Sequence, residues 1–270
     1  MPWLQHVRGQ GRIQGDSGCG DSDNIDPERV RIPDGVYPQG GHPRIHYSRQ
    51  LQRNLWPLAP EPQEGEGMKS KCKTGLVLTP PGSRILLHAC CAPCSSAIVE
   101  CLVNQGFRPV IFFSNSNIFP QDEYDRRRNE CLRYAAETGL EIVEDNYDHK
   151  EWQCIARGLG HEPEKGLRCT ECFRYRLSRA ASYASRNGFD VLTTTLASSR
   201  WKDLRQVNDA GAYACSLFPG LTWWEMNWRK GGLQERRNEI IREHGFYNQL
   251  YCGCEFSIAS SPAMKDSDLI

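Results

Sequence analysis

The sequence predicts an α/β fold in which a parallel sheet of about five strands is flanked by helices. From Ser83 onward, short runs rich in β-branched and aromatic residues alternate with longer amphipathic stretches. This alternation is typical of βαβ units, whose strands pair in parallel. A glycine also follows each of four predicted helices, where a left-handed residue readily ends a helix. These glycines are Gly106, Gly139, Gly188 and Gly245.

The predicted strands are short and mostly apolar, as expected for strands that helices cover on both faces. They are Arg84–His88, Pro109–Phe113, Leu140–Val143, Asp190–Thr195 and Leu221–Met226. The stretches between and after them carry apolar residues at helical spacing. These predicted helices are Ser95–Gln105, Gln121–Thr138, His149–Arg157, Glu171–Asn187, Lys202–Ala214 and Leu233–His244.

The chain divides into three parts by composition. Residues 1–82 are rich in glycine, proline and arginine, which predicts a mostly irregular extension with a short helix near residues 45–56. Residues 83–257 form the predicted catalytic, metal-binding α/β domain, and residues 258–270 form a C-terminal tail. Cys19 and Cys72 lie in the extension, apart from the cysteines that suggest chemistry.

Charge and hydropathy exclude several classes of protein. Lys plus Arg and Asp plus Glu both number 33, so no net charge draws the whole protein to nucleic acid or to an anionic membrane. No apolar run approaches the roughly 20 residues that cross a bilayer. The first ten residues lack the pattern of a secretory signal. We therefore expect a cytoplasmic protein without a membrane partner.

Seven of the 13 cysteines fall into three clusters: Cys90, Cys91 and Cys94; Cys169 and Cys172; Cys252 and Cys254. In a reducing compartment, clustered thiols indicate metal or redox chemistry rather than structural disulfides. A closed structural zinc site takes four ligands and leaves three of these thiols unexplained. An iron-sulfur cluster also takes four thiolates but brings electron transfer, so we favour it over zinc.

Each cluster occupies a place suited to ligand binding. Cys90, Cys91 and Cys94 follow the first strand directly, at the end of a parallel sheet where ligands bind. Cys169 and Cys172 lie at the start of a long helix, whose free N–H groups favour thiolate. Between Cys252 and Cys254, a glycine allows the backbone to turn so that both sulfurs face one side.

Basic residues follow two of the strands at the same end of the sheet. Arg200 and Lys202 come after the fourth strand, and Arg229 and Lys230 come after the fifth. They are candidate contacts to RNA phosphates, and Trp201 is a candidate for stacking on a base. The alternative for Arg200 and Lys202 is a solvated helix start. Arg126 to Arg128 are interpreted as a solvated, self-paired helix face.

Three motifs, in order along the chain, resemble the QueH family of cobalamin-independent epoxyqueuosine reductases. They are Leu-Leu-His-Ala-Cys-Cys-Ala-Pro-Cys-Ser at 86–95, Cys-Thr-Glu-Cys-Phe-Arg-Tyr-Arg at 169–176 and Tyr-Cys-Gly-Cys-Glu-Phe-Ser at 251–257. The resemblance implies an α/β fold related to the nucleotide-binding domains of the PP-loop and HUP type. It also implies reduction of epoxyqueuosine to queuosine in tRNA, the last step of queuosine formation.

The resemblance further implies a [4Fe–4S] cluster bound through Cys90, Cys91, Cys169 and Cys172. Cys94 competes with Cys91 for the fourth position, and both adjacent cysteines can face one cluster only from irregular backbone. Cys252 and Cys254 are then either a redox-active pair or ligands of a second metal, iron or zinc. The partners are tRNA carrying epoxyqueuosine at the wobble position and an unidentified electron donor.

Two alternative functions remain open at this point. One is a zinc-bound module that binds tRNA without catalysis. The other is a cluster-dependent tRNA sulfur transferase, although the chain lacks the Ser-Gly-Gly-x-Asp-Ser phosphate loop that would activate a base with ATP.

Overall fold

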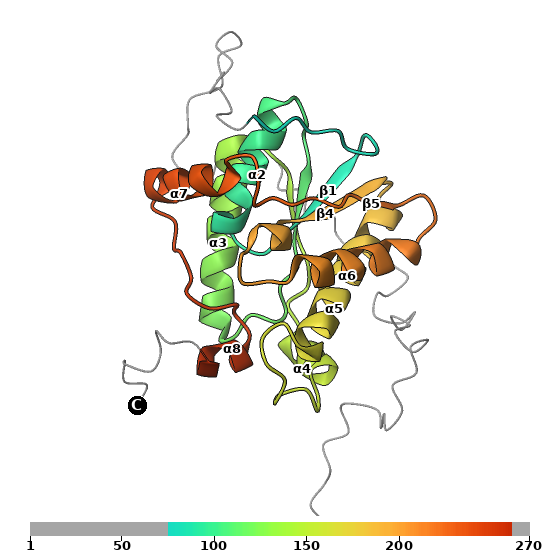
Figure 1. The fold of residues 1–270 in the computed structure, drawn as a ribbon, viewed down its shortest axis with the longest axis vertical. Helices are drawn as coiled ribbons and strands as arrows, with labels where there is room; N and C mark the ends of the chain where they lie inside the picture. The colour runs from blue at the N-terminus through green and yellow to red at the C-terminus, as the bar shows by residue number, and fades with distance from the viewer. Residues whose placement is uncertain (1–74, 261–270) are drawn as a thin grey trace, which may run out of the picture. The chain divides into compact units, whose positions relative to one another are not determined.

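The computed structural model describes residues 75–260. It confirms the predicted α/β fold, with a five-stranded sheet in the order β3-β2-β1-β4-β5 and every pair parallel (Figure 1). The strands are β1 (Ile85–Ala89), β2 (Val110–Phe113), β3 (Ile142–Glu144), β4 (Val191–Thr194) and β5 (Thr222–Trp223). The predicted helix near residues 45–56, Cys19 and Cys72 lie outside the described residues.

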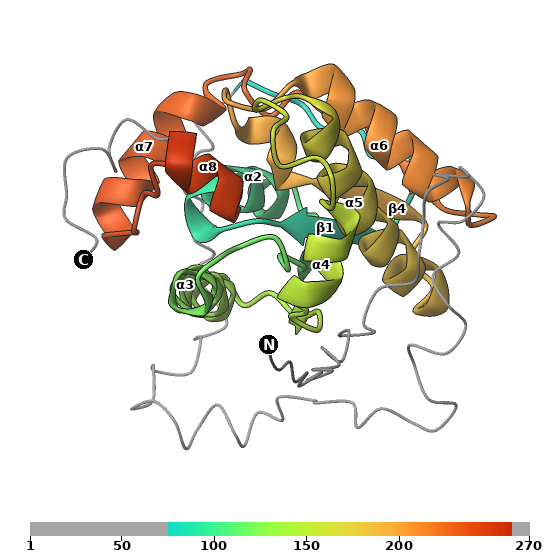
Figure 2. The same ribbon diagram turned by 90° about the horizontal axis from the view of Figure 1, so that it is seen from below.

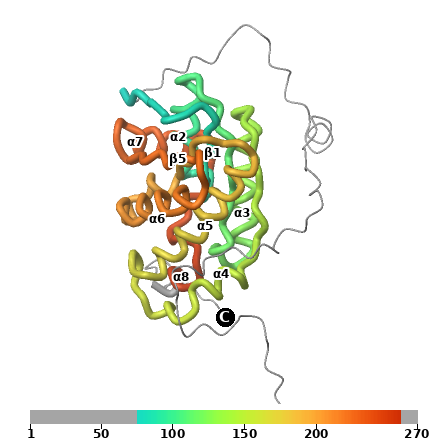
Figure 3. Tube along the Cα trace, turned by 90° about the vertical axis from the view of Figure 1, so that its right-hand side faces the viewer, coloured from blue at the N-terminus to red at the C-terminus, as the bar shows by residue number. Residues whose placement is uncertain are grey.

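Helices cover both faces of the sheet. In the described part of the chain they are α2 (Ala92–Asn104), α3 (Gln121–Thr138), α4 (His149–Ile155), α5 (Leu167–Arg186), the 3₁₀ helix η2 (Thr195–Ser198), α6 (Leu204–Ser216), α7 (Leu233–His244) and α8 (Glu255–Ser260). Because parallel crossovers are right-handed, this strand order places α2 and α3 on one face and α5 and α6 on the other. Figure 3 shows α3 and α6 on opposite sides of β1.

The core lies around the two central strands. All five residues of β1 and all four of β4 are buried. The strands run in register, with Leu87 beside Ile111 of β2 and Thr193 of β4. Their carboxyl ends therefore meet at one edge of the sheet. Figure 2 views the molecule from the end at which α4 and α8 lie.

The structure corrects the predicted start of α2. The predicted helix begins at Ser95, but α2 begins at Ala92 with Pro93 in its first turn. A proline is tolerated there because the first N–H groups of a helix have no partner within the helix. Cys94 therefore lies inside the helix, and Cys91 is its N-terminal cap.

The structure also differs from the prediction at other places, among them β5, which is shorter than the predicted Leu221–Met226. Helix α5 begins at Leu167 rather than Glu171, so Cys169 and Cys172 both lie within its first two turns. Helix α6 begins at Leu204 rather than Lys202, because Asp203 caps it by accepting a hydrogen bond from the Gln206 backbone N–H. The short helix α8 (Glu255–Ser260), absent from the prediction, follows the last cysteine.

None of the helices within residues 75–260 combines the length and the hydropathy that a bilayer crossing requires.

Candidate metal and redox site

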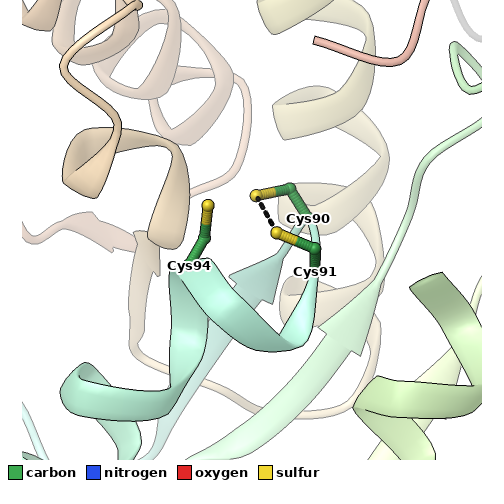
Figure 4. A group of neighbouring side chains, drawn as sticks. All are labelled: Cys90, Cys91 and Cys94. Carbon is green, nitrogen blue, oxygen red and sulfur yellow. Dashed lines mark hydrogen bonds between the residues drawn. The ribbon is translucent and has the colours of Figure 1, made fainter. Parts of the chain in front are cut away.

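Three cysteine sulfurs gather at the carboxyl end of β1. The sulfur atoms of Cys90, Cys91 and Cys94 all lie within 4.8 Å of one another (Figure 4). Strand β1 ends at Ala89, and Cys91 adopts an extended cap conformation before α2. The side chains of Cys90 and Cys91 thus escape the alternation of a strand, and their sulfurs lie 3.8 Å apart. The irregular backbone required for two adjacent ligands is present.

Electrostatics distinguish the three thiols of this group. Hydrogen bonds from the neighbouring thiols lower the pKa of Cys90 well below its ordinary value. Burial raises the pKa of Cys91, and the interaction with Cys90 raises that of Cys94 to about 11. Cys90 is therefore the thiol of this group that most readily becomes a thiolate, the form that binds metal.

Neighbouring polar side chains hold this group in place. The Thr195 hydroxyl accepts a hydrogen bond from the Cys90 backbone N–H at 3.2 Å. The Gln249 side-chain amide donates to the Cys91 sulfur at 2.8 Å, across 158 residues of sequence. Both contacts tie the cysteine loop to distant segments, and the sequence pattern indicated neither of them.

The other four cysteines form a second set, on α5 and on the segment before α8. Cys172 and Cys254 are buried in one apolar cluster with Trp152. Burial and the negative charge of Cys252 raise the pKa of Cys169 above its ordinary value. Burial raises the pKa of Cys172 as well, so the thiolate character expected at the start of this helix is wrong for the metal-free protein. Desolvation there outweighs the helix dipole.

Arg127 holds the backbone of the Cys252 loop. This side chain is 2% exposed, pairs with Glu123 at 2.6 Å and donates a hydrogen bond to the Cys252 carbonyl at 3.0 Å. The prediction of a self-paired face is correct for Arg127, but the prediction of a solvated face is wrong for this residue, whereas Arg126 is exposed. Helical phase explains the difference, since Arg127 lies on the face that buries Tyr124 and Cys131.

Gly253 occupies a conformation that suits glycine. Its φ of +114° lies in the region that other residues rarely adopt. Its carbonyl accepts a hydrogen bond from the Phe119 N–H at 2.8 Å, which fastens the loop to the segment between β2 and α3. The predicted turn between Cys252 and Cys254 is thus present, and the connection between β2 and α3 stabilises it.

Lys202 connects the two sets of cysteines. Its ammonium nitrogen lies 3.3 Å from the Cys252 sulfur. Burial alone would lower the pKa of Lys202, but the negative charges of Cys252, Cys90 and Cys94 outweigh it and raise the pKa. The Lys202 carbonyl accepts a hydrogen bond from Arg229 at 2.8 Å. Of the four predicted basic residues, Lys202 thus faces the sulfurs, Arg229 anchors its backbone, and Arg200 and Lys230 are exposed.

Another cation near the cysteines, the buried Arg176, was not identified from the sequence. It is 2% exposed and donates hydrogen bonds to the Ser114 carbonyl and the Asn115 side chain. Its charge opposes the rise in the pKa of Cys172 and helps to lower that of Cys90. Arg176 lies four residues after Cys172, one helical turn away, and this spacing was the available signal.

His88 lies behind the site as a satisfied core residue. One ring nitrogen bonds to the Thr194 hydroxyl at 2.7 Å and the other to the Ser114 carbonyl at 3.1 Å. Burial lowers its pKa to about 3, so the ring is neutral. The groups arranged to bind a metal are therefore the thiols, and the charges that compensate them come from Lys202 and Arg176.

The sequence profile described as "Epoxyqueuosine reductase QueH" matches residues 85–260 of this chain. The chain belongs to the QueH family. A relative named epoxyqueuosine reductase QueH from Acinetobacter baylyi is 44% identical over 189 residues, which cover 70% of this chain and 87% of the relative. The relative of the same name from Histophilus somni is 41% identical over 186 residues, 69% of this chain and 76% of its own length.

A more distant QueH relative, from Thermotoga maritima, is 30% identical over 177 residues, which cover 64% of this chain and 90% of the relative. The QueH profile spans all seven clustered cysteines as well as Lys202 and Arg176. The family match therefore coincides with the part of the chain that builds the site.

Proposed function

We propose that this chain is a cytoplasmic iron-sulfur oxidoreductase that reduces epoxyqueuosine to queuosine at the wobble position of tRNA. The reaction replaces the epoxide with an alkene, consumes two electrons and two protons, and releases water. The observation that carries the proposal is the convergence of two cysteine sets on Lys202, within a chain of the QueH family. The name of the family indicates the substrate, and the thiols supply chemistry suited to electron transfer.

The donor set fits a [4Fe–4S] cluster. Such a cluster takes four thiolates, and we propose Cys90, Cys91, Cys169 and Cys172, with Cys94 competing for the place of Cys91. Two observations support this set. Cys90 and Cys91 leave the regular strand, so both sulfurs face one side. The charge of Arg176 acts on both Cys90 and Cys172, so one proposed ligand after β1 and one on α5 interact with the same buried cation. When bound, the cluster supplies electrons one at a time.

Cys252 and Cys254 are proposed to face the substrate, either as a redox-active pair or as ligands of a second metal, iron or zinc. Lys202 donates a hydrogen bond to the Cys252 sulfur at 3.3 Å and so holds a positive charge beside it. The same ammonium group carries protons beside the Cys252 sulfur, and the epoxide oxygen needs a proton to leave as water. Burial of Cys254 and Cys172 excludes water from the inner side of the site.

The exposed bases extend the site toward RNA. Arg200 and Lys230 lie at the surface after β4 and β5, and we assign them to the phosphate backbone. Arg229 acts indirectly, because it holds the Lys202 carbonyl. The electrons come from an external donor, whose identity no residue of the site specifies.

The decisive experiment compares Cys169→Ala with Cys215→Ala after anaerobic purification. Cys215 is a buried cysteine of α6 whose pKa burial alone raises, so it serves as the matched control. Cys169→Ala should lose iron, acid-labile sulfide and visible absorbance, and should no longer reduce tRNA-bound epoxyqueuosine in nucleoside mass analysis. Cys215→Ala should retain all four properties.

Three outcomes would contradict the proposal. Full epoxide reduction by iron-free Cys169→Ala would exclude the cluster from the reaction. Stoichiometric zinc in colourless wild-type protein, without turnover of the modified tRNA, would favour the zinc-bound tRNA-binding module instead. Sulfur incorporation into tRNA would favour the sulfur transferase.

A further inference from the structure

Large apolar side chains are unevenly distributed over the surface of the described residues. Those that are prominently exposed are Val77, Phe119, Leu167, Trp201, Leu217 and Leu250. Phe119 follows β2, Leu167 begins α5, Trp201 follows β4, and Leu250 precedes the Cys252 loop. These four residues, which we call the rim, therefore belong to the segments that carry or flank the cysteines. Exposed apolar groups gathered beside a site commonly mark a contact with a partner.

Trp201 is the most exposed residue of the rim, with 77% of its surface accessible to solvent. It lies in the turn between η2 and α6, next in the chain to Lys202. Lys202 turns inward and reaches the Cys252 sulfur, whereas Trp201 turns outward into solvent. The exposed tryptophan thus lies one residue from a group that contacts the Cys252 sulfur.

The turn that presents Trp201 is fixed from both sides. The Lys202 N–H donates to the Ser199 carbonyl at 3.3 Å, and Arg229 donates to the Lys202 carbonyl at 2.8 Å. Asp203 then caps α6. A rigidly held aromatic ring loses little conformational freedom on binding, so an exposed tryptophan on such a turn is suited to recognition.

We propose that Trp201 stacks on an unpaired base of the tRNA anticodon loop next to the reacting nucleotide. A base that enters the cysteine site must leave the stack of its neighbours, which exposes the face of an adjacent base. Stacking on aromatic side chains is the general way in which proteins hold such bases. This inference rests on the proposed function and identifies Trp201 as the residue that holds the RNA by stacking on a base.

The charges around Trp201 favour RNA over a protein electron donor as the partner. Arg200 precedes it directly, Arg205 is exposed in the first turn of α6 and pairs with Asp209 at 3.8 Å, and Lys230 is exposed after β5. The acidic residue of the turn, Asp203, is occupied as the cap of α6. A basic surface interleaved with an aromatic ring is the pattern expected for single-stranded nucleic acid.

The test measures binding of a fluorescently labelled, unmodified anticodon stem-loop RNA by anisotropy, at fixed salt. Trp201→Ala should weaken binding by roughly 5- to 150-fold, the range found when a base-stacking aromatic is removed. Trp201→Phe retains an aromatic ring and should weaken RNA binding much less. Leu217→Ala removes an exposed apolar side chain located before β5, away from the rim, and should bind like the wild type.

A second measurement distinguishes stacking from general damage to the turn. The fluorescent base 2-aminopurine, placed on either side of the wobble nucleotide, should be quenched on binding to wild type and to Trp201→Phe. The quenching at one of these positions should vanish with Trp201→Ala, at RNA concentrations that saturate the variant.

Unchanged RNA affinity and unchanged quenching in Trp201→Ala would overturn the inference. The inference would also be overturned if Trp201→Ala bound RNA normally and reduced the epoxide more slowly only when a protein supplied the electrons. The rim would then bind the electron donor. Because the RNA is unmodified, both readouts are independent of epoxide reduction. A wild type that binds the stem-loop through Trp201 but never reduces the epoxide would refute the proposed function alone.

Discussion

The ammonium nitrogen of Lys202 lies 3.3 Å from the sulfur of Cys252, although 50 residues separate them in the sequence. Negative charge at Cys252, Cys90 and Cys94 acts on this one ammonium group. A single cation thus responds to thiols from two separate cysteine sets. This arrangement makes Lys202 the first residue to test for a role in the reaction.

Lys202→Met should slow epoxide reduction by roughly 10- to 100-fold, because a charge-assisted hydrogen bond to the Cys252 sulfur is lost. The measurement is the single-turnover rate at saturating RNA, with iron content determined in the same samples. Lys230→Met is the matched comparison, since Lys230 is exposed and should affect RNA affinity but not this rate. Equal rates for Lys202→Met and wild type would remove Lys202 from the reaction.

Arg127→Met should destabilise the protein by about 3 to 5 kcal/mol, because it leaves the buried Glu123 carboxylate without its partner. Its neighbour Arg126 is exposed and lies over the Tyr247 ring, so Arg126→Met should cost less than about 1 kcal/mol. Urea unfolding compares the two variants. The double variant Glu123→Gln/Arg127→Met should recover part of the loss. If Arg127→Met and Arg126→Met destabilised the protein to a similar degree, the assigned role of Arg127 would be contradicted.

Gly253→Ala should impair reduction as well as stability. A β-carbon at this position would lie 2.9 Å from a guanidinium nitrogen of Arg127, and the residue keeps a φ of +114°. The backbone strain alone costs on the order of 1 to 3 kcal/mol. Gly158→Ala is the control, since its φ is +76° with open space around the added β-carbon. Both variants should lose stability to urea, but only Gly253→Ala should lose turnover.

The Asp190 carboxylate should make a small, acid-sensitive contribution to stability. Hydrogen bonds from the Ser83 and Arg84 backbone N–H groups, at 3.0 and 2.7 Å, lower its pKa. A lowered pKa stabilises the fold above the ordinary value near 3.9, and this stabilisation disappears as the pH falls through the folded-state pKa. Solvent screening limits the contribution to less than about 1 kcal/mol.

Urea unfolding of wild type and Asp190→Asn checks this expectation. The wild type should be the more stable protein at pH 7, and the difference should shrink below about pH 3.9. A difference that stayed constant down to acid pH would mean that the charge of Asp190 contributes nothing to stability.

The alternation of strand and helix patterns was sufficient to predict the parallel sheet and the position of Cys90 directly after β1. Boundaries were harder to predict where side-chain capping decides them. Asp203 delays α6, and Pro93 fits within the first turn of α2. The ligand set of the cluster and the roles of Cys252 and Cys254 stay predictions, which rest on the family resemblance and on the thiols themselves.

The sequence by itself determined which thiols are candidates for the site, because clustered cysteines in loops are a local pattern and parallel strands end at one edge of a sheet. Only the tertiary structure decided what surrounds them. Gln249 reaches Cys91 across 158 residues, and Arg127 reaches the Cys252 carbonyl across 125. Such contacts depend on how separate elements pack, and no periodicity within one element specifies its partner. For the same reason, only the fold shows that Lys202 faces the sulfurs while its neighbour Trp201 faces solvent.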